Sequence, residues 1–386
     1  MSIRILIAGG GVAGLEAALA LRAYAGADVE PEVLEARAVF ELPAIATPRA
    51  FGWTGRSLPL STLAERAGFR LRRGALAAVD AEAHLVITHA DEAIGYDRLI
   101  LAVGARRETS TDASLTFGGP EDVPAFQRLL AQVSRGARQG VVTRLVFVVP
   151  PGPGWPLPAY ELALATARRL ERRGVRDAVL ITLVTAEERP LDVFGAGASA
   201  AIECDLLAAG ITTITGVVGT GRSWGRLHLR PARSVGADRV VSLPRLRGPG
   251  LEGVPADAEG FIETRGDGRV AGLDDVYAIG DATTFPVKQG GVACQQADNV
   301  AGIIAADVGR RHATEPFEPV LLAQLWDDER GRGLSTHLAG GRPAGPGATW
   351  RTADLWPWHH KVSCRFLASF LEEAVGGGRK GPVRRG

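Results

Sequence analysis

Three glycines near the N-terminus have the spacing of a phosphate-binding turn. Residues 9–14 read GGGVAG, directly after an apolar stretch that predicts a buried strand over residues 3–8 and before a helical pattern. This order binds a dinucleotide because N–H groups at a helix N-terminus hold phosphate. Gly9 permits the tight turn, Gly11 lets the backbone approach a pyrophosphate, and Gly14 lets helix and strand pack closely.

An acidic residue follows at the position where it would bind a ribose. Glu35 ends a second short strand over residues 32–34, 21 residues after Gly14, and a carboxylate there accepts hydrogen bonds from ribose hydroxyls. The predicted helix over residues 15–24 would point its positive dipole end at the phosphates, and Val12 and Ala13 of the turn are expected at the cofactor as well. A glycine turn that serves packing alone is the alternative. The flanking strand and helix, together with the acid, favour a dinucleotide.

Two later segments repeat the pattern of a buried strand that ends in glycine. Residues 96–105 read YDRLILAVGA, and residues 276–283 read VYAIGDAT before a predicted helix over residues 292–307. Apolar, β-branched runs of this length are typical of central strands in a parallel sheet. The residues that we expect at a cofactor in these segments are Gly104, Gly280, Asp281 and Val292.

Taken together, GGGVAG, YDRLILAVGA and VYAIGDAT resemble the motifs of pyridine-nucleotide-dependent flavoproteins with two dinucleotide-binding domains. Sulfide:quinone oxidoreductases and type II NADH dehydrogenases are similar members of that family. The resemblance covers residues 1 to about 310 and implies FAD as the cofactor, with Asp281 at its ribityl chain. Val103 stands where the family usually has threonine, at a position where the backbone matters most.

The resemblance also implies the fold class and the domain organisation. The class is α/β, with two Rossmann-like domains, the second inserted into the first, and a C-terminal α-containing region. The expected divisions are residues 1–105 and 262–310 for the FAD-binding domain, 106–261 for the inserted NAD(P)-binding-like domain, and 311–386 for a C-terminal interface region that ends in a disordered basic tail. A helix is expected over residues 364–374, because its apolar residues fall on one face.

The glycine turn of the inserted domain departs from the family pattern. Residues 150–158, after a predicted strand over 143–149, hold five prolines around two glycines. Proline has no N–H, so this turn offers few phosphate donors and leaves NAD(P)H binding open. Beyond the next strand come Glu187 and Glu188, with Arg189 poorly placed for a 2′-phosphate, so NADH is favoured over NADPH.

Two charged side chains are the candidates for catalysis. The resemblance places Glu161 near nicotinamide and flavin, where burial would raise its pKa and suit it to proton transfer; a first-turn helix glutamate is the alternative. Lys288 is one of three lysines and lies in a segment, residues 286–299, that resembles the wall of the electron-acceptor pocket. A cation there would favour negative charge on the flavin. A solvated surface lysine is the alternative.

The three cysteines and paired histidines give weaker signals. Cys204, Cys294 and Cys364 show no metal-ligand spacing, and the turn at residues 152–155 lacks the cysteine that sulfide oxidation by the usual route needs. We interpret Cys294 as an inert core thiol, although a bond to Cys364 stays open. His359 and His360 are adjacent and cannot both face one ion from a helix, so no metal is expected.

Composition excludes several classes of protein. Lys+Arg 44 against Asp+Glu 43 gives a net charge of +1, which does not suit a dedicated nucleic-acid binder. No run of 18 apolar residues predicts a transmembrane helix, and no targeting segment is visible. We therefore expect a cytoplasmic protein, with peripheral membrane contact and a homodimer left open.

The function predicted from the sequence is that of an FAD-dependent oxidoreductase. It would take hydride from NAD(P)H and pass electrons to a quinone or another small acceptor, in the manner of an NAD(P)H dehydrogenase. One alternative is a flavoprotein that acts directly on a small substrate without NAD(P)H. A second alternative, of another class, is a flavin redox sensor with little turnover.

Overall fold

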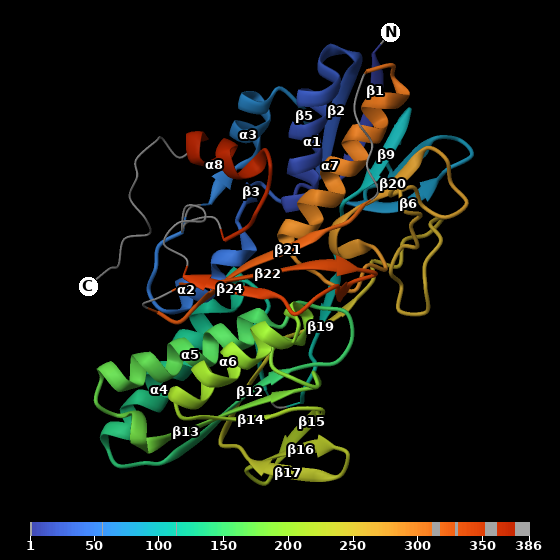
Figure 1. The fold of residues 1–386 in the computed structure, drawn as a ribbon. Coiled ribbons are helices and arrows are strands. Elements are labelled where there is room, and N and C mark those ends of the chain that lie inside the picture. The colour runs from blue at the N-terminus through green and yellow to red at the C-terminus, as the bar shows by residue number, and fades with distance from the viewer. Residues whose placement is uncertain are drawn as a thin grey trace.

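The chain folds into two α/β units with a small C-terminal sheet packed between them (Figure 1). The computed structural model describes residues 2–55, 57–112, 114–310, 317–328, 331–351 and 361–374. The first unit is formed by two separate stretches of chain, because β9 and β20 are neighbours in one sheet although the whole second unit lies between them in the sequence. The insertion implied by the resemblance is therefore seen directly.

The first unit is built on a parallel sheet in the order β20-β9-β1-β2-β5. Its strands are β1 (Ile3–Ala8), β2 (Val29–Glu35), β5 (Arg70–Arg73), β9 (Arg98–Leu101) and β20 (Val276–Ala278). Helices α1 (Val12–Ala25) and α7 (Gly290–Asp307) lie side by side against it (Figure 1). Both helices are rich in alanine and glycine on the buried face, so their backbones approach closely.

Shorter elements complete the first unit. They are β3 (Val39–Phe40), α2 (Ala46–Ala50), β4 (Leu58–Pro59), α3 (Leu60–Ala67), and the antiparallel strands β6 (Leu76–Asp80), β7 (Leu85–Thr88) and β8 (Ala93–Gly95). Helix α3 ends at Gly68, whose φ of 71° forms a left-handed cap that favours glycine.

The second unit is built on a parallel sheet in the order β11-β18-β12-β13-β14. Its strands are β11 (Leu115–Thr116), β12 (Thr143–Val149), β13 (Val179–Thr185), β14 (Ile211–Ile214) and β18 (Arg239–Ser242), and its helices are α4 (Val123–Arg138), α5 (Leu157–Arg172) and α6 (Ala196–Ala208). An antiparallel sheet is formed by β15 (Val218–Ser223), β16 (Arg226–Arg230) and β17 (Arg233–Gly236). Strands β10 (Arg106–Glu108) and β19 (Arg245–Arg247) pair where the chain enters and leaves this unit.

The C-terminal region forms a sheet as well as a helix. Strands β21 (Val320–Trp326), β22 (Gly331–Ala339), β23 (Arg342–Pro343) and β24 (Ala348–Arg351) precede helix α8 (Leu367–Ala374). The sequence predicts only the helix, three residues longer at its start. The paired histidines and the basic tail lie outside the described residues.

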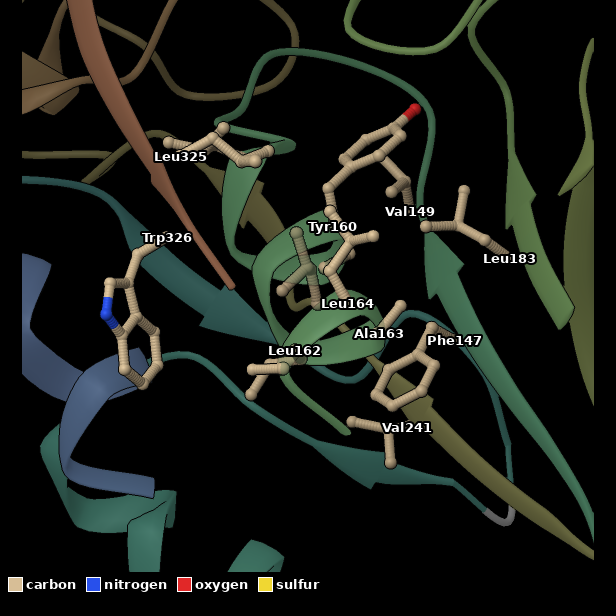
Figure 2. Close-up of a cluster of buried hydrophobic side chains, with 14 of the residues drawn as sticks. Phe147, Val149, Tyr160, Leu162, Ala163, Leu164, Leu183, Val241, Leu325 and Trp326 are labelled. Atoms are coloured by element: carbon tan, nitrogen blue, oxygen red, sulfur yellow. The ribbon is translucent and has the colours of Figure 1, made fainter. Parts of the chain in front are cut away.

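Helix α5 has apolar neighbours on two sides. The sheet residues Phe147, Val149 and Leu183 pack against one side, and Leu325 and Trp326 of β21 lie on the other (Figure 2). Because α5 is buried by both neighbours, the C-terminal sheet and the second unit share one apolar core. This packing fixes the N-terminal part of α5, which carries Glu161, relative to β21.

The predicted α/β class with parallel sheets is confirmed. Among the described residues, no helix is long and apolar enough to cross a membrane.

Candidate functional site

The glycine turn after β1 has the conformation that the spacing predicts. Gly9 has a φ of 113°, and a Cβ atom there would lie 2.3 Å from the carbonyl oxygen of Ala102. A Cβ atom on Gly14 would lie 1.9 Å from the carbonyl oxygen of Gly9, so α1 can pack this closely only with glycine. Gly11 has no atom within 4 Å of the position where its Cβ would be. Open space therefore lies where a pyrophosphate would approach the backbone.

That space belongs to a large cavity between the two units, of about 1210 Å³. The volume exceeds the roughly 300–1,000 Å³ of sites for drug-sized ligands, so the cavity has room for a ligand as large as a dinucleotide. The predicted site residues that line it are Gly9, Gly11, Val12, Ala13, Glu35, Gly104, Glu161, Gly280, Asp281 and Lys288.

Two predicted cofactor residues do not line the cavity. Gly14 lies beneath the turn, against Gly9. Val292 is buried in the apolar core, and its N–H donates to the side-chain oxygen of Gln289 at 2.9 Å. Gln289 caps α7 in this way, and it is Gln289 that lines the cavity.

Glu35 is held as a carboxylate at the adenosine end of the cavity. It accepts hydrogen bonds from the Gly10 N–H at 2.8 Å and from the Arg37 guanidinium at 3.0 and 3.1 Å. Burial opposes its ionisation, but these hydrogen bonds and the charge of Arg37 outweigh it and lower the pKa of Glu35. An ionised carboxylate is the form that accepts ribose hydroxyls, so the site fits FAD.

Asp281 and Lys288 form the second polar part of the cavity. Lys288 is 4% exposed, donates to the Thr283 carbonyl oxygen, and lies 4.0 Å from the centre of the Phe261 ring. Burial lowers the pKa of Lys288 to about 8, although the negative charges of Asp281 and Asp257 act to raise it. Burial also raises the pKa of Asp281, with Lys288 opposing it. The two side chains therefore stabilise each other's charge.

Removing the Lys288 cation is expected to make the flavin harder to reduce. We predict that Lys288→Met lowers the two-electron midpoint potential by about 30 mV, which corresponds to about 1.4 kcal/mol. Because the pKa is lowered to about 8, the difference from wild type is largest below pH 8 and disappears above it. Spectroelectrochemical titration measures this shift, and Arg66→Met, at an exposed position, is the control. Equal potentials for wild type and Lys288→Met at pH 7 would contradict the assignment.

Glu161 and Lys361 form a buried ion pair at the wall of the same cavity. Glu161 is 1% exposed and accepts the Trp326 N–H at 3.0 Å, the Lys361 ammonium, and a hydrogen bond from Thr47. Burial raises the pKa of Glu161, and Lys361, Trp326 and Thr47 offset part of that rise. Lys361 has a φ of 45°, a conformation that L residues seldom adopt and that occurs often at functional sites.

Sequence reasoning missed Lys361 as a member of the site. The residue lies 200 positions from Glu161, and no local pattern connects them. The scarcity of lysine could have indicated its role, because the chain has three lysines and two of them line this cavity.

The proline-rich turn of the second unit is bonded to the first unit. The Gly154 N–H donates to the Pro286 carbonyl oxygen at 3.1 Å, and the Lys288 N–H donates to the Gly154 oxygen at 3.1 Å. The amide that a phosphate would use at Gly154 is therefore already occupied.

Glu187, just past the end of β13, also lines the cavity. It accepts hydrogen bonds from the Tyr160 hydroxyl at 2.6 Å and the Thr185 hydroxyl at 2.9 Å. Burial raises the pKa of Glu187 to about 7. Arg189 pairs with Asp192 at 2.8 Å.

The cysteines correct one interpretation. Cys294 is joined by a disulfide to Cys364, with 5.3 Å between their Cα atoms, and Cys204 is free and exposed. Cys294 is thus not an isolated core thiol. The pairing arises because the chain before α8 folds back over α1, where Glu16 accepts the N–H groups of residues 365–367 at 2.6–2.9 Å.

Comparison with known proteins shows the family. Residues 3–297 match the family of pyridine nucleotide-disulphide oxidoreductases. The chain belongs to this family. Its members bind FAD, and many use NAD(P)H, so the chain belongs to a family of FAD-dependent oxidoreductases.

Individual relatives agree with this membership. The sulfide-quinone reductase of Aquifex aeolicus (strain VF5) is 27% identical over 217 residues, which is 54% of this chain and 49% of that protein. The match thus spans about half the length of that relative. The solved structure of the sulfide:quinone oxidoreductase from Aquifex aeolicus superposes with a TM-score of 0.79 and 20% identity. The match covers 97% of this chain and 90% of the Aquifex chain. The covalent putidaredoxin reductase-putidaredoxin complex matches with a TM-score of 0.64 and 21% identity, over 86% of this chain and 81% of the matched chain. These likenesses show the fold.

A bulky side chain at Gly11 is expected to exclude FAD without unfolding the protein. Gly11 has a φ of −80° and open space around it, so Gly11→Val is tolerated by the polypeptide but would fill the space of the pyrophosphate. We predict purified Gly11→Val with less than about a tenth of the wild-type FAD and a retained melting transition. The matched control is Gly266→Val, an exposed glycine with equally open space. A full flavin spectrum in Gly11→Val would refute the placement.

Proposed function

We propose that this protein passes two electrons from NADH through FAD to a quinone. The bound flavin supplies the two-electron chemistry, and the side chains described above hold the reactants and move protons. The balanced reaction is NADH + H⁺ + quinone → NAD⁺ + hydroquinone. Each turnover therefore needs a proton to reach a quinone oxygen inside the cavity.

The Glu161–Lys361 pair is the observation that supports a quinone acceptor. The pair is buried and borders the cavity, so it can hold a proton away from bulk water, between Lys361 Nζ and the Glu161 carboxylate. Burial raises the pKa of Glu161, which favours proton uptake by the carboxyl, and the Lys361 ammonium donates to the same carboxyl. This arrangement suits an acceptor that takes up protons with its electrons.

NADH is supported by the residues at the end of β13. Glu187 lies two residues past the end of β13 and borders the cavity, so its carboxylate would accept the ribose hydroxyls of a bound NADH. Arg189 is held by Asp192, so it is not placed to bind a 2′-phosphate, and this favours NADH over NADPH.

A second candidate is a flavoprotein that oxidises a small substrate directly. One observation favours it: the Gly154 N–H is bonded to Pro286, and the prolines of this turn have no N–H to offer. Electrons would then enter from a donor other than NAD(P)H.

Anaerobic mixing of the oxidised holoenzyme with NADH or NADPH tests the donor. If NADH is the donor, the flavin absorbance bleaches with NADH faster than with NADPH. If the absorbance stays unchanged with both nucleotides, the first proposal for the donor is wrong and the second candidate stands.

A further inference from the structure

One glutamine on β21 is buried without a partner in the wall of the cavity. Gln324 is 4% exposed, and its Oε1 has no hydrogen-bond partner within the described part of the chain. Burying an unsatisfied carboxamide costs about 1–3 kcal/mol, so such a group calls for an explanation. Several buried polar atoms in the described ranges lack a partner, but Gln324 alone among them borders this cavity.

Other polar groups along β21 do have hydrogen-bond partners, unlike the side-chain oxygen of Gln324. On the same strand, the Leu322 oxygen accepts from Gln289 at 3.1 Å and the Trp326 N–H donates to Glu161 at 3.0 Å. The Gln295 side chain donates a hydrogen bond to the Val320 carbonyl oxygen and accepts one from the Val320 N–H, each at 2.9 Å. Polar side chains thus satisfy this strand on either side of Gln324. Among these groups, the side-chain oxygen of Gln324 is left without a partner in the described part of the chain, on a residue that borders the cavity.

A carboxamide suits a ligand whose oxygen changes from a hydrogen-bond acceptor to a hydrogen-bond donor during the reaction. Its NH₂ group donates and its oxygen accepts. A quinone presents carbonyl oxygens that accept hydrogen bonds, and the hydroquinone presents hydroxyls that donate them. Turning the amide by half a revolution about its last side-chain bond satisfies either state. A carboxylate or an ammonium group could serve only one of them.

We propose that Gln324 binds one oxygen of the quinone, beside the Glu161–Lys361 pair. This inference rests on the proposed function and names a residue that sets affinity for its acceptor. Gln324 and Trp326 are alternate residues of β21, and the Trp326 N–H is bonded to Glu161, so one strand positions both the binding group and the proton-holding group.

Gln324→Met tests the proposal, because methionine has a similar shape and no amide. Duroquinone is titrated into the oxidised holoenzyme, and its dissociation constant is read from the perturbation of the flavin absorbance. We expect this constant to rise about tenfold, the loss of one hydrogen bond. FAD content and the rate of flavin reoxidation by ferricyanide should stay as in wild type. The melting temperature should be equal or higher, since an unsatisfied buried group is removed.

Gln324→Glu is the second variant, and Gln139→Met, at an exposed position, is the control. The glutamate has no NH₂ group, so duroquinone binding should weaken while FAD is retained. Unchanged duroquinone affinity in Gln324→Met would overturn the proposal. Loss of FAD from both variants would also overturn it, because the carboxamide would then bind the cofactor.

The failure of the proposed function would look different. In that case wild type itself would neither bind duroquinone nor be reoxidised by it, and both proposals would fall. If wild type binds and reduces duroquinone and Gln324→Met does so equally well, the role of Gln324 alone is wrong.

Discussion

Removing the Cys294–Cys364 bond is expected to lower the free energy of unfolding by about 4 kcal/mol. The bond joins residues 70 positions apart, and a loop of this length loses much of its chain entropy in the unfolded state when it is closed. The bond also anchors the segment that carries Lys361 to α7. We therefore expect Cys294→Ala/Cys364→Ala to unfold at lower urea concentration and to hold FAD less tightly.

Urea unfolding followed by tryptophan fluorescence measures this effect, with and without dithiothreitol. Wild type in dithiothreitol should resemble the double variant, and the double variant should not respond to the reductant. Cys204→Ser is the control, because Cys204 is free and exposed. Identical unfolding curves for wild type with and without dithiothreitol would show that the bond contributes nothing.

Neutralising one member of the Glu161–Lys361 pair is expected to cost more than neutralising both. Glu161→Gln leaves the buried Lys361 ammonium without its carboxylate, which typically costs about 3–5 kcal/mol. In Glu161→Gln/Lys361→Met the unpaired charge is gone, and most of the stability should return. Both variants should reduce quinone slowly, because neither holds the proton at Glu161.

Chemical denaturation and the rate of quinone reduction separate these two effects. The control is Glu171→Gln, on the same helix α5, whose partner Arg168 lies at 3.9 Å in an exposed pair; its stability should change by less than about 1 kcal/mol. A double variant as unstable as Glu161→Gln would mean that the charges do not interact as the structure indicates. Full quinone reductase activity in Glu161→Gln would remove Glu161 from the proton path.

Local patterns were sufficient for the elements around the glycine turn. The GGGVAG turn predicts β1, α1 and β2 because each glycine has a separate steric reason, and those reasons appear in the structure as the contacts of Gly9 and Gly14. Glu35 and Asp281 follow from their positions at strand ends, and both line the cavity.

The features that the sequence did not reveal all depend on contacts between distant residues. Strand β21 reads VLLAQLW, and an apolar run without alternation does not distinguish a strand from a buried helix. Lys361, which pairs with Glu161, and Cys364, which pairs with Cys294, lie far along the chain in the segment before α8. The bonded amide of Gly154 depends on a loop of the other unit, so the proline pattern alone could not show it.

Reoxidation of the flavin by a quinone tests most directly whether a quinone is the electron acceptor. The purified holoenzyme is photoreduced without oxygen and mixed with duroquinone in a stopped-flow instrument. We expect the flavin absorbance to return at a rate that rises with duroquinone concentration and then saturates, as binding in the cavity requires. A flavin that stays bleached with duroquinone, while ferricyanide reoxidises it, would contradict a quinone as the acceptor.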